Sequence, residues 1–275
     1  MQALQGKTAI VTGASAPNGI GRATSLQLAK EGARVVVTDM DGALDSKGDR
    51  LNKLDLLQGL VGEITNAGGE AIAVELDVTS KSDIDQCVLK AEQSFQSVDI
   101  LVNNAGSLAG TGDFLDTTAE EWVTSFNVNL LGVMMLCQAA IPHMRLAGGG
   151  SIVNVGSTGS LGAEPGFGAY TTMKHGLIGL TKLIAAEFGP DNIRCNAVCP
   201  GYTETDMHMA VNERLAAEQN VSLEAIKQKR YETVAMRRAG KPAEVAKAIS
   251  YLVSDSAEYV TGVALPVSGG VPYGI

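Results

Sequence analysis

Short apolar runs alternate with longer amphipathic stretches along most of the chain. The short runs are almost continuously apolar, as expected for strands of a parallel sheet that is covered on both faces. Longer stretches between them have the length and periodicity of helices. The predicted strands are 8–12, 34–38, 71–76, 100–102, 151–155, 193–198 and 263–267, and the predicted helices include 21–31, 82–94, 120–146, 169–188 and 242–254.

Repeated strand–helix–strand units predict an α/β fold, a Rossmann-type doubly wound parallel sheet of seven strands. At the start of the third helix, Thr118 and Glu121 have the spacing of a capping box. No low-complexity linker or internal repeat divides the sequence. We therefore expect a single domain over residues 1–275.

Two segments are longer than a simple strand–helix connection requires. Residues 41–57 follow the second strand and are polar, and residues 202–238 follow the sixth strand and are expected to form one or two short helices. Long connections in compact domains are commonly binding loops or lids. Because ligands bind at the carboxyl ends of strands in open α/β sheets, we expect 202–238 to be a substrate lid.

Composition narrows the possible partners. The chain has 21 basic and 30 acidic side chains, a net charge of −9, and no cluster of Lys and Arg. This balance disfavours nucleic acid and anionic membrane surfaces, and the most apolar stretch, 128–141, is too short to span a bilayer. The four cysteines form no CxxC pair, so we expect buried thiols, no metal site and a cytoplasmic protein without a signal peptide.

A glycine-rich turn directly follows the first strand and opens the first helix. The amino end of a helix carries unpaired N–H groups and partial positive charge, which attract a diphosphate. Glycine lets the backbone turn sharply and approach the ligand. The residues expected to bind the cofactor here are Gly13, Ser15, Asn18, Gly19, Ile20 and Gly21.

Asp39 ends the second predicted strand. In this fold an acidic side chain at that place accepts hydrogen bonds from the adenosine ribose and repels a 2′-phosphate. Neither Asn18 nor Met40 supplies the cation that a 2′-phosphate requires. The sequence therefore predicts NAD rather than NADP as the cofactor.

A second group of polar residues surrounds the helix at 169–188. Tyr170 and Lys174 are four residues apart and share one helix face, and Ser157 precedes them just after a strand. Asn103–Asn104–Ala105–Gly106 ends the fourth strand, and Asn129 lies on the following helix.

With these motifs the sequence resembles the short-chain dehydrogenase/reductase family, in its single-domain branch. The resemblance runs from Lys7 to Gly270 and includes Asn196 and the pair Thr261–Gly262. It implies hydride transfer between a nicotinamide cofactor and a secondary alcohol or ketone. The catalytic residues that it implies are Asn129, Ser157, Tyr170 and Lys174.

In this implied mechanism Tyr170 is the acid/base, Ser157 holds the substrate oxygen, Lys174 binds the nicotinamide ribose and Asn129 anchors a water chain. Lowering the pKa of a tyrosine from about 10 to about 7 requires roughly 4 kcal/mol. We expect the Lys174 cation and the positive oxidised nicotinamide to supply it. The resemblance also assigns cofactor contacts to Asp77, Val78, Asn104, Ala105, Gly106, Tyr170, Lys174, Pro200, Gly201, Thr203 and Thr205.

The sequence departs from the pattern of this branch in several places. Five residues separate Gly13 from Gly19 where three are usual, a spacing similar to that of the enoyl-reductase members. Those members place their lysine further from the tyrosine, at the position that Leu177 occupies here. We therefore retain the dehydrogenase interpretation. The length of 41–57 leaves the surroundings of Asp39 open, and Ser268 replaces an aspartate that many relatives carry.

The leading hypothesis is an NAD-dependent dehydrogenase of a small polar secondary alcohol: a polyol, a sugar or a hydroxy acid. The main alternative is an NADPH-dependent 3-oxoacyl-thioester reductase, for which Arg214, Lys227, Lys229 and Arg230 offer basic groups, although a solvated helix face also explains them. A cofactor-binding scaffold without turnover is disfavoured by the full set of catalytic residues. The candidate substrate contacts are Ser107, Ser157, Ser160, Glu164, Tyr202 and His208.

Helices 120–146 and 169–188 are apolar on more than one face. Such helices must be buried on both sides. We expect them to form a symmetric subunit interface, and the family resemblance implies a homotetramer.

Overall fold

One parallel sheet of seven strands organises the protein. The computed structural model describes residues 3–41 and 52–272. Its strands lie in the order β3-β2-β1-β4-β5-β6-β7, with every pair parallel. The strands are β1 Thr8–Val11, β2 Arg34–Asp39, β3 Glu70–Glu75, β4 Ile100–Asn103, β5 Gly150–Val155, β6 Ile193–Pro200 and β7 Ala264–Val267. The predicted doubly wound α/β fold is confirmed, and each predicted strand is present.

The strand order reverses between β1 and β4. From β1 the chain winds outward through β2 to β3, then returns to β4 and winds the other way to β7. Connections on either side of this point diverge, which leaves a crevice at the carboxyl ends of β1 and β4 where ligands bind in this fold. The topology alone therefore locates the site.

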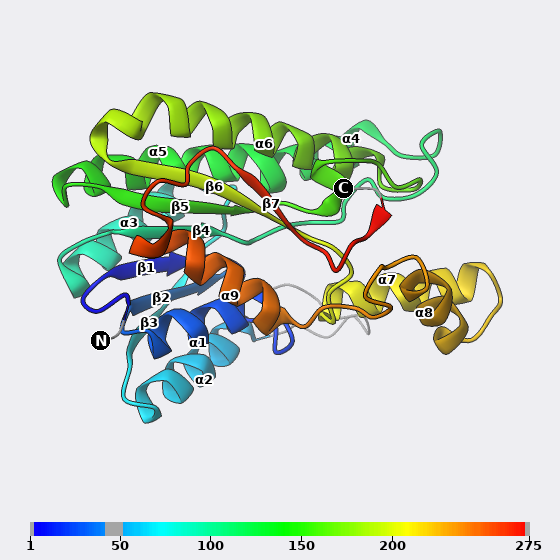
Figure 1. The fold of residues 1–275 in the computed structure, drawn as a ribbon, viewed down its shortest axis with the longest axis horizontal. Helices are drawn as coiled ribbons and strands as arrows, with labels where there is room; N and C mark the ends of the chain where they lie inside the picture. The colour runs from blue at the N-terminus through cyan, green and yellow to red at the C-terminus, as the bar shows by residue number, and fades with distance from the viewer. Residues whose placement is uncertain (1–2, 42–51, 273–275) are drawn as a thin grey trace.

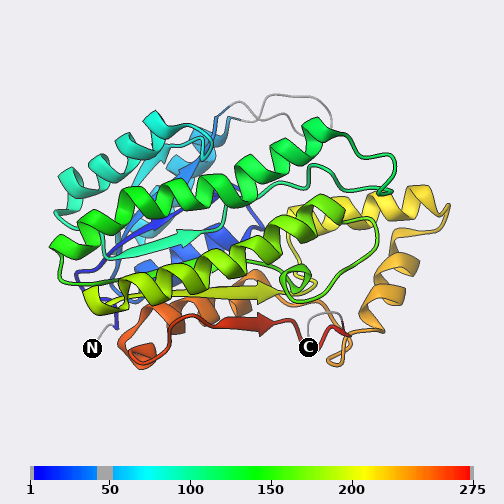
Figure 2. The same ribbon diagram turned by 90° about the horizontal axis from the view of Figure 1, so that it is seen from above.

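Helices cover both faces of the sheet (Figures 1 and 2). On one face α1, α2 and α9 pack over a core that includes Val35 and Leu60, and on the other α3, α5 and α6 pack over a core that includes Val36 and Leu136. Alternate residues of β2 thus point into the two separate cores. The helices are α1 Ile20–Lys30, α2 Lys53–Asn66, α3 Lys81–Phe95, α4 Ala119–Phe126, α5 Gly132–Leu146, α6 Gly168–Phe188, α7 Asp206–Glu218, α8 Leu223–Tyr231 and α9 Pro242–Val253.

The predicted helix 120–146 is interrupted in the middle. α4 begins with the predicted capping box of Thr118 and Glu121, and a π-helical turn at Asn127–Leu131 joins it to α5. The continuous helical stretch Ala119–Leu146 is long and apolar enough to cross a membrane by length and composition, but 44% of its most apolar window is buried inside the protein. One helix of this kind is weak evidence for a membrane span, because core helices of water-soluble proteins reach the same length and hydropathy.

The sequence predicts a polar connection over residues 41–57. This prediction is wrong for the carboxyl end of the segment, which is helical. α2 already begins at Lys53, because the Asn52 side chain caps it by accepting a hydrogen bond from the Asp55 N–H. Leu57 is buried in the core beneath this helix. Residues 42–51 lie outside the described part of the chain.

The predicted lid, 202–238, contains the two helices α7 and α8, which extend beyond the carboxyl end of the sheet (Figures 1 and 2). Its two ends are tied together: the Gly240 N–H donates to the Tyr202 carbonyl, and the Glu204 N–H donates to the Gly240 carbonyl, both at 2.8 Å. The chain therefore leaves the sheet before α7 and returns after α8 at nearly the same place. That this segment moves on ligand binding stays a prediction.

Candidate active site

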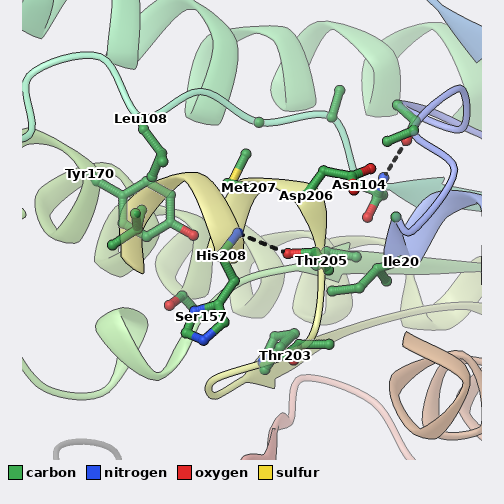
Figure 3. Close-up of a pocket in the computed structure, with 18 of the residues that line it drawn as sticks. Ile20, Asn104, Leu108, Ser157, Tyr170, Thr203, Thr205, Asp206, Met207 and His208 are labelled. Carbon is green, nitrogen blue, oxygen red and sulfur yellow. Dashed lines mark hydrogen bonds between the residues drawn. The ribbon is translucent and has the colours of Figure 1, made fainter. Parts of the chain in front are cut away.

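A cleft of about 940 Å³ opens at the carboxyl ends of the central strands. The glycine-rich turn forms one end and Tyr170 lies toward the other, while the start of α7, with Asp206, lies near the glycine-rich turn (Figure 3). Its lining includes most of the residues expected to bind a cofactor: Gly13, Ser15, Gly19, Ile20, Asp39, Asp77, Val78, Asn104, Ala105, Gly106, Tyr170, Lys174, Pro200, Gly201, Thr203 and Thr205.

The glycine-rich turn brings backbone unusually close to its neighbours. Gly13 has a φ of +65°, and a Cβ on it would lie 2.9 Å from the Cα of Ala105. Behind it the Asn104 side-chain amide donates to the carbonyls of Thr12 at 2.8 Å and Gly13 at 2.9 Å. These contacts fix the turn between β1 and β4.

The amino end of α1 suits an anion. Its N-cap is Gly19, which offers no side chain to cap the first N–H groups. These donors and the helix dipole are therefore available to a diphosphate, and Gly19 and Ile20 line the cleft. The turn fits the diphosphate of a dinucleotide.

Two residues of the expected phosphate cradle lie elsewhere. Gly21 is buried behind the turn, where a Cβ would lie 2.4 Å from the Gly13 carbonyl oxygen, so its small size serves packing. Asn18 does not line the cleft. Its backbone N–H and side-chain amide instead donate to the Asp206 carboxylate at 3.2 and 2.8 Å, which joins the longer glycine turn to the start of α7.

The Asp39 carboxylate lies at the far end of the cleft from Tyr170. It accepts hydrogen bonds from the Ser15 N–H at 3.2 Å, the Ser15 hydroxyl at 2.6 Å and the Met40 N–H at 3.0 Å. The Lys53 ammonium, at the start of α2, lies 2.9 Å from the Asp39 oxygen that also accepts from the Met40 N–H. Sequence reasoning missed Lys53, because the cation was sought only beside the glycine turn and at the end of β2.

Ser157 and Tyr170 meet at the opposite end of the cleft. Ser157 follows β5, and its hydroxyl accepts from the Gly159 N–H at 3.0 Å. The same side chain hydrogen-bonds to Tyr170. Burial raises the pKa of Tyr170 above its usual value, and the bond from Ser157 opposes that shift.

Lys174 lies one helical turn after Tyr170 and is only 4% exposed. Its ammonium donates to the Val155 carbonyl at 2.7 Å and lies 5.6 Å from the centre of the Tyr170 ring. Burial lowers the pKa of this ammonium to about 8. Burial of the phenol has the largest effect on the pKa of Tyr170, and the expectation that Lys174 and the oxidised nicotinamide together lower this pKa stays a prediction.

Asn129 lies on the π-helical turn and is fully buried. Its side-chain amide donates to the Ser107 carbonyl at 3.0 Å and the Ser125 hydroxyl at 3.1 Å, and its oxygen accepts from the Ser107 N–H at 3.0 Å. The side chain thus holds the loop that follows β4. The role as anchor of a water chain stays a prediction.

Two of the candidate substrate contacts lie outside the cleft lining, which corrects the expectation for them. The Ser107 hydroxyl accepts from the Ala109 N–H at 3.1 Å, and the buried Ser160 hydroxyl accepts from the Ser157 N–H at 3.0 Å. Both are used in shaping local turns. Ser157, Glu164, Tyr202 and His208 do line the cleft.

A charged pair, Glu164 and Arg230, lines the same cleft as Ser157 and Tyr170. The Arg230 guanidinium lies 3.6 Å from the Glu164 carboxylate, stacks 4.3 Å from the centre of the Tyr202 ring and donates to Asn212. Burial raises the pKa of Glu164, while Arg230 and a hydrogen bond from Tyr202 oppose that shift. The Arg230 side chain is only 11% exposed, so the interpretation of this arginine as part of a solvated helix face is wrong.

His208 is held in its neutral form. Its ring forms a cluster with the rings of Tyr202 and Tyr231, whose centres lie 5.5 and 6.0 Å from it, and shares a hydrogen bond of 3.1 Å with the Tyr231 hydroxyl. Burial, with the Arg230 and Lys227 cations, lowers its pKa to about 4. At neutral pH the imidazole therefore offers hydrogen bonds without charge.

All four cysteines are buried free thiols, as predicted. In the described residues no three His, Cys, Asp or Glu side chains are grouped to hold a metal ion.

Comparison with known proteins points to one family. Residues 13–272 match a family model described as enoyl-(acyl carrier protein) reductase. The chain is 37% identical over 268 residues to 3-oxoacyl-[acyl-carrier-protein] reductase FabG of Thermotoga maritima, with 98% of each protein covered.

Solved structures agree in fold along nearly the whole chain. A variant of actinorhodin polyketide ketoreductase with NADPH has a TM-score of 0.86 and 34% identity, covering 96% of this chain and 97% of that one. A putative gluconate dehydrogenase from Agrobacterium tumefaciens has a TM-score of 0.83 and 32% identity, covering 98% and 96%. This chain belongs to the short-chain dehydrogenase/reductase family of oxidoreductases that act on CH–OH groups.

Proposed function

We propose that this protein is an NAD-dependent dehydrogenase that interconverts a secondary alcohol and a ketone on a small polar substrate. The observation that carries the proposal is one continuous cleft. It has the Asp39 carboxylate at one end and Ser157, Tyr170, Lys174 and Glu164 at the other.

The protein's part in the reaction is proton transfer. A bound nicotinamide supplies or accepts the hydride. In alcohol oxidation the Tyr170 phenolate takes the hydroxyl proton as the hydride leaves the carbinol carbon, and in ketone reduction the phenol returns it. Ser157 donates to the substrate oxygen, and the buried Lys174 cation stabilises negative charge on the phenol.

The charged pair next to the catalytic residues favours a hydroxylated substrate. Glu164 accepts hydrogen bonds and Arg230 donates them, and together they add no net charge to this end of the cleft. A polyol or sugar uses both groups without leaving a charge uncompensated. The carboxylate of a hydroxy acid would face both Arg230 and the Glu164 carboxylate, so it ranks second.

NAD is the cofactor that Asp39 favours. The carboxylate is positioned by Ser15 and by the Met40 N–H to accept from a ribose hydroxyl, and its charge repels a 2′-phosphate. Native enzyme with a higher kcat/KM for NADP than for NAD would refute this preference.

A substrate panel tests the proposal as a whole. Polyols, sugars and hydroxy acids are offered with NAD, and reduction of the cofactor is followed by absorbance. Glu164→Gln keeps the shape of the side chain but removes its charge, and we expect KM for the best polyol or sugar to rise about tenfold with a smaller change in kcat. Equal activity of native and variant protein on every substrate would refute the role of Glu164.

A second candidate is the reduction of a 3-oxoacyl thioester, which the 37% identity to the Thermotoga maritima reductase favours. Three of the four basic residues considered for it are engaged or lie in the cleft: Arg214 contacts Thr111 and Glu218, Lys227 pairs with Glu224 and Arg230 lines the cleft. Lys229 is exposed and does not line the cleft. Reduction of an acetoacetyl thioester with NADPH, faster than oxidation of any polyol with NAD, would select this candidate.

We also propose a homotetramer. Val123, Phe126, Leu146 and Leu183, which lie on or at the ends of α4, α5 and α6, are exposed large apolar side chains. A subunit interface on these helices would bury them. Light scattering that shows an active monomer at micromolar concentration would refute the proposal.

A further inference from the structure

We infer that Lys53 is a cofactor-specificity residue: it neutralises Asp39 and can pair with a 2′-phosphate, so that the protein binds NADP as well as NAD. The inference deepens the proposed cofactor choice and rests on a dinucleotide binding in the cleft. It arises from the ion pair between Asp39 and Lys53, at the start of α2.

The Asp39 carboxylate already accepts hydrogen bonds at all of its usual positions. A carboxylate has about four lone-pair positions. In Asp39 one oxygen accepts from the Ser15 N–H and hydroxyl, and the other accepts from the Met40 N–H and the Lys53 ammonium. A ribose hydroxyl can therefore reach Asp39 only when one of these donors moves.

Lys53 is the donor best able to move. Two of the others are backbone N–H groups fixed by the fold, and the Ser15 hydroxyl lies at 2.6 Å on a side chain with one rotatable bond to it. The Lys53 ammonium is carried on a four-carbon stem, and its side chain is 20% exposed. Displacement of this group by a ribose hydroxyl keeps the remaining contacts of Asp39.

The Lys53–Asp39 ion pair also sets the charge at this end of the cleft. An unpaired carboxylate at 11% exposure would strongly repel a 2′-phosphate, but the Lys53 ammonium 2.9 Å away offsets its charge. Lys53 also lines the cleft itself, together with Leu56 of the same helix. The displaced ammonium therefore stays beside the 2′ position of the ribose, where a phosphate would be its partner.

Among the described residues that line this end of the cleft, Lys53 is the sole Lys or Arg, and Asp77 adds a second carboxylate. Removing Lys53 thus leaves two acidic groups facing the phosphate and no described cation there. We expect the two dinucleotides to respond differently to this change. NADP should bind more weakly, because its 2′-phosphate loses the ammonium. NAD should bind about as before, because its ribose hydroxyl no longer competes with the ammonium for Asp39.

Binding is measured by titration calorimetry of the full chain with NAD, NADP and two fragments, 2′-AMP and 5′-AMP. For Lys53→Met we expect the Kd of NADP and of 2′-AMP to rise at least tenfold, and the Kd of NAD and of 5′-AMP to change less than threefold. Lys53→Arg keeps a cation and should retain NADP binding within about threefold. The control Lys90→Met removes an exposed lysine of α3 that does not line the cleft, and should alter none of these values.

Native protein that binds neither NADP nor 2′-AMP overturns the inference and leaves the NAD proposal intact. Lys53→Met with unchanged NADP affinity also overturns it. If the native protein prefers NADP while Lys53→Met loses it, the NAD preference fails and the role of Lys53 stands. Loss of both dinucleotides to the same degree would show that Lys53 only supports the fold of this end, which contradicts the inference.

Discussion

The two ends of the cleft are built in different ways. At the catalytic end Ser157, Tyr170 and Lys174 come from one strand–helix unit, β5 and α6, and the tyrosine and lysine share a helix face. At the adenosine end Ser15, Asp39 and Lys53 come from three separate elements. The first end is specified locally along the chain, and the second depends on how the fold brings distant segments together.

This difference explains which parts of the site could be predicted from sequence. Helical periodicity places Tyr170 and Lys174 together without knowledge of tertiary structure, and the alternation of apolar runs predicts the sheet. The pairing of Asp39 with Lys53, fourteen residues apart, depends on where α2 begins. Asn52 sets that start, because its side chain caps α2 by accepting from the Asp55 N–H. This capping residue is visible in the sequence, but it lies within the segment predicted to be a loop.

Polar residues in turns were the other source of error. Ser107 and Ser160 have the same side chain as Ser157, and nothing local distinguishes a serine that faces a substrate from one that closes a turn. In the structure all three hydroxyls accept from a nearby backbone N–H, and Ser157 differs in that it also lines the cleft and hydrogen-bonds to Tyr170. Arg230 shows the converse, since a basic residue in a polar helix proved to lie in the cleft.

The largest expected effect is a loss of turnover at the catalytic end alone. Tyr170→Phe removes one oxygen and keeps the ring that contacts Phe167, so the fold should survive. Loss of the proton-transfer group should lower kcat by a factor of about 10²–10⁴ or more, while the Kd of NAD measured by calorimetry stays within about threefold. A folded variant with more than about a tenth of native turnover would contradict the mechanism.

At the adenosine end, Asp39→Asn should weaken NAD binding and leave kcat nearly unchanged. In Asp39→Asn the ribose loses a charged acceptor and the 2′-phosphate loses a repelling group. We expect the Kd of NAD to rise about tenfold, equivalent to about 1.4 kcal/mol, the ratio of NAD to NADP affinity to fall, and kcat at saturating NAD to stay within about threefold. A large fall in kcat at saturation would remove the distinction between the two ends.

The pH dependence should also belong to the catalytic end. Alcohol oxidation requires the Tyr170 phenolate, and burial raises the pKa of this group, so kcat/KM for oxidation should increase as pH rises above neutrality. Ketone reduction requires the phenol and should decrease over the same range. Lys174→Met removes the neighbouring cation and should move both profiles to higher pH, whereas Asp39→Asn should move neither. Profiles that shift equally in both variants would refute the separation.

A smaller effect is expected where α7 joins the two ends. Asp206 lies at the start of this helix and accepts from Asn18 of the glycine turn. Amide hydrogen exchange over residues 203–230 should slow by a few fold when NAD and a substrate analogue are added together, as expected if the segment closes over the cleft. Exchange that is unchanged by both ligands would refute the assignment of this segment as a lid.

The burial of Lys174 has a consequence for the stability of the whole fold. In the unfolded chain its pKa is near 10.5, and in the folded protein burial lowers it to about 8. Between these two values the unfolded state binds more protons, so this group makes the folded protein more stable as pH rises through that window. Below about pH 8 the burial of the charged ammonium lowers the free energy of unfolding by about 3 kcal/mol, at 1.36 kcal/mol for each pKa unit. At neutral pH the protein therefore holds the Lys174 cation in the cleft at a cost that is sizeable beside the 5–15 kcal/mol that typically stabilises a domain.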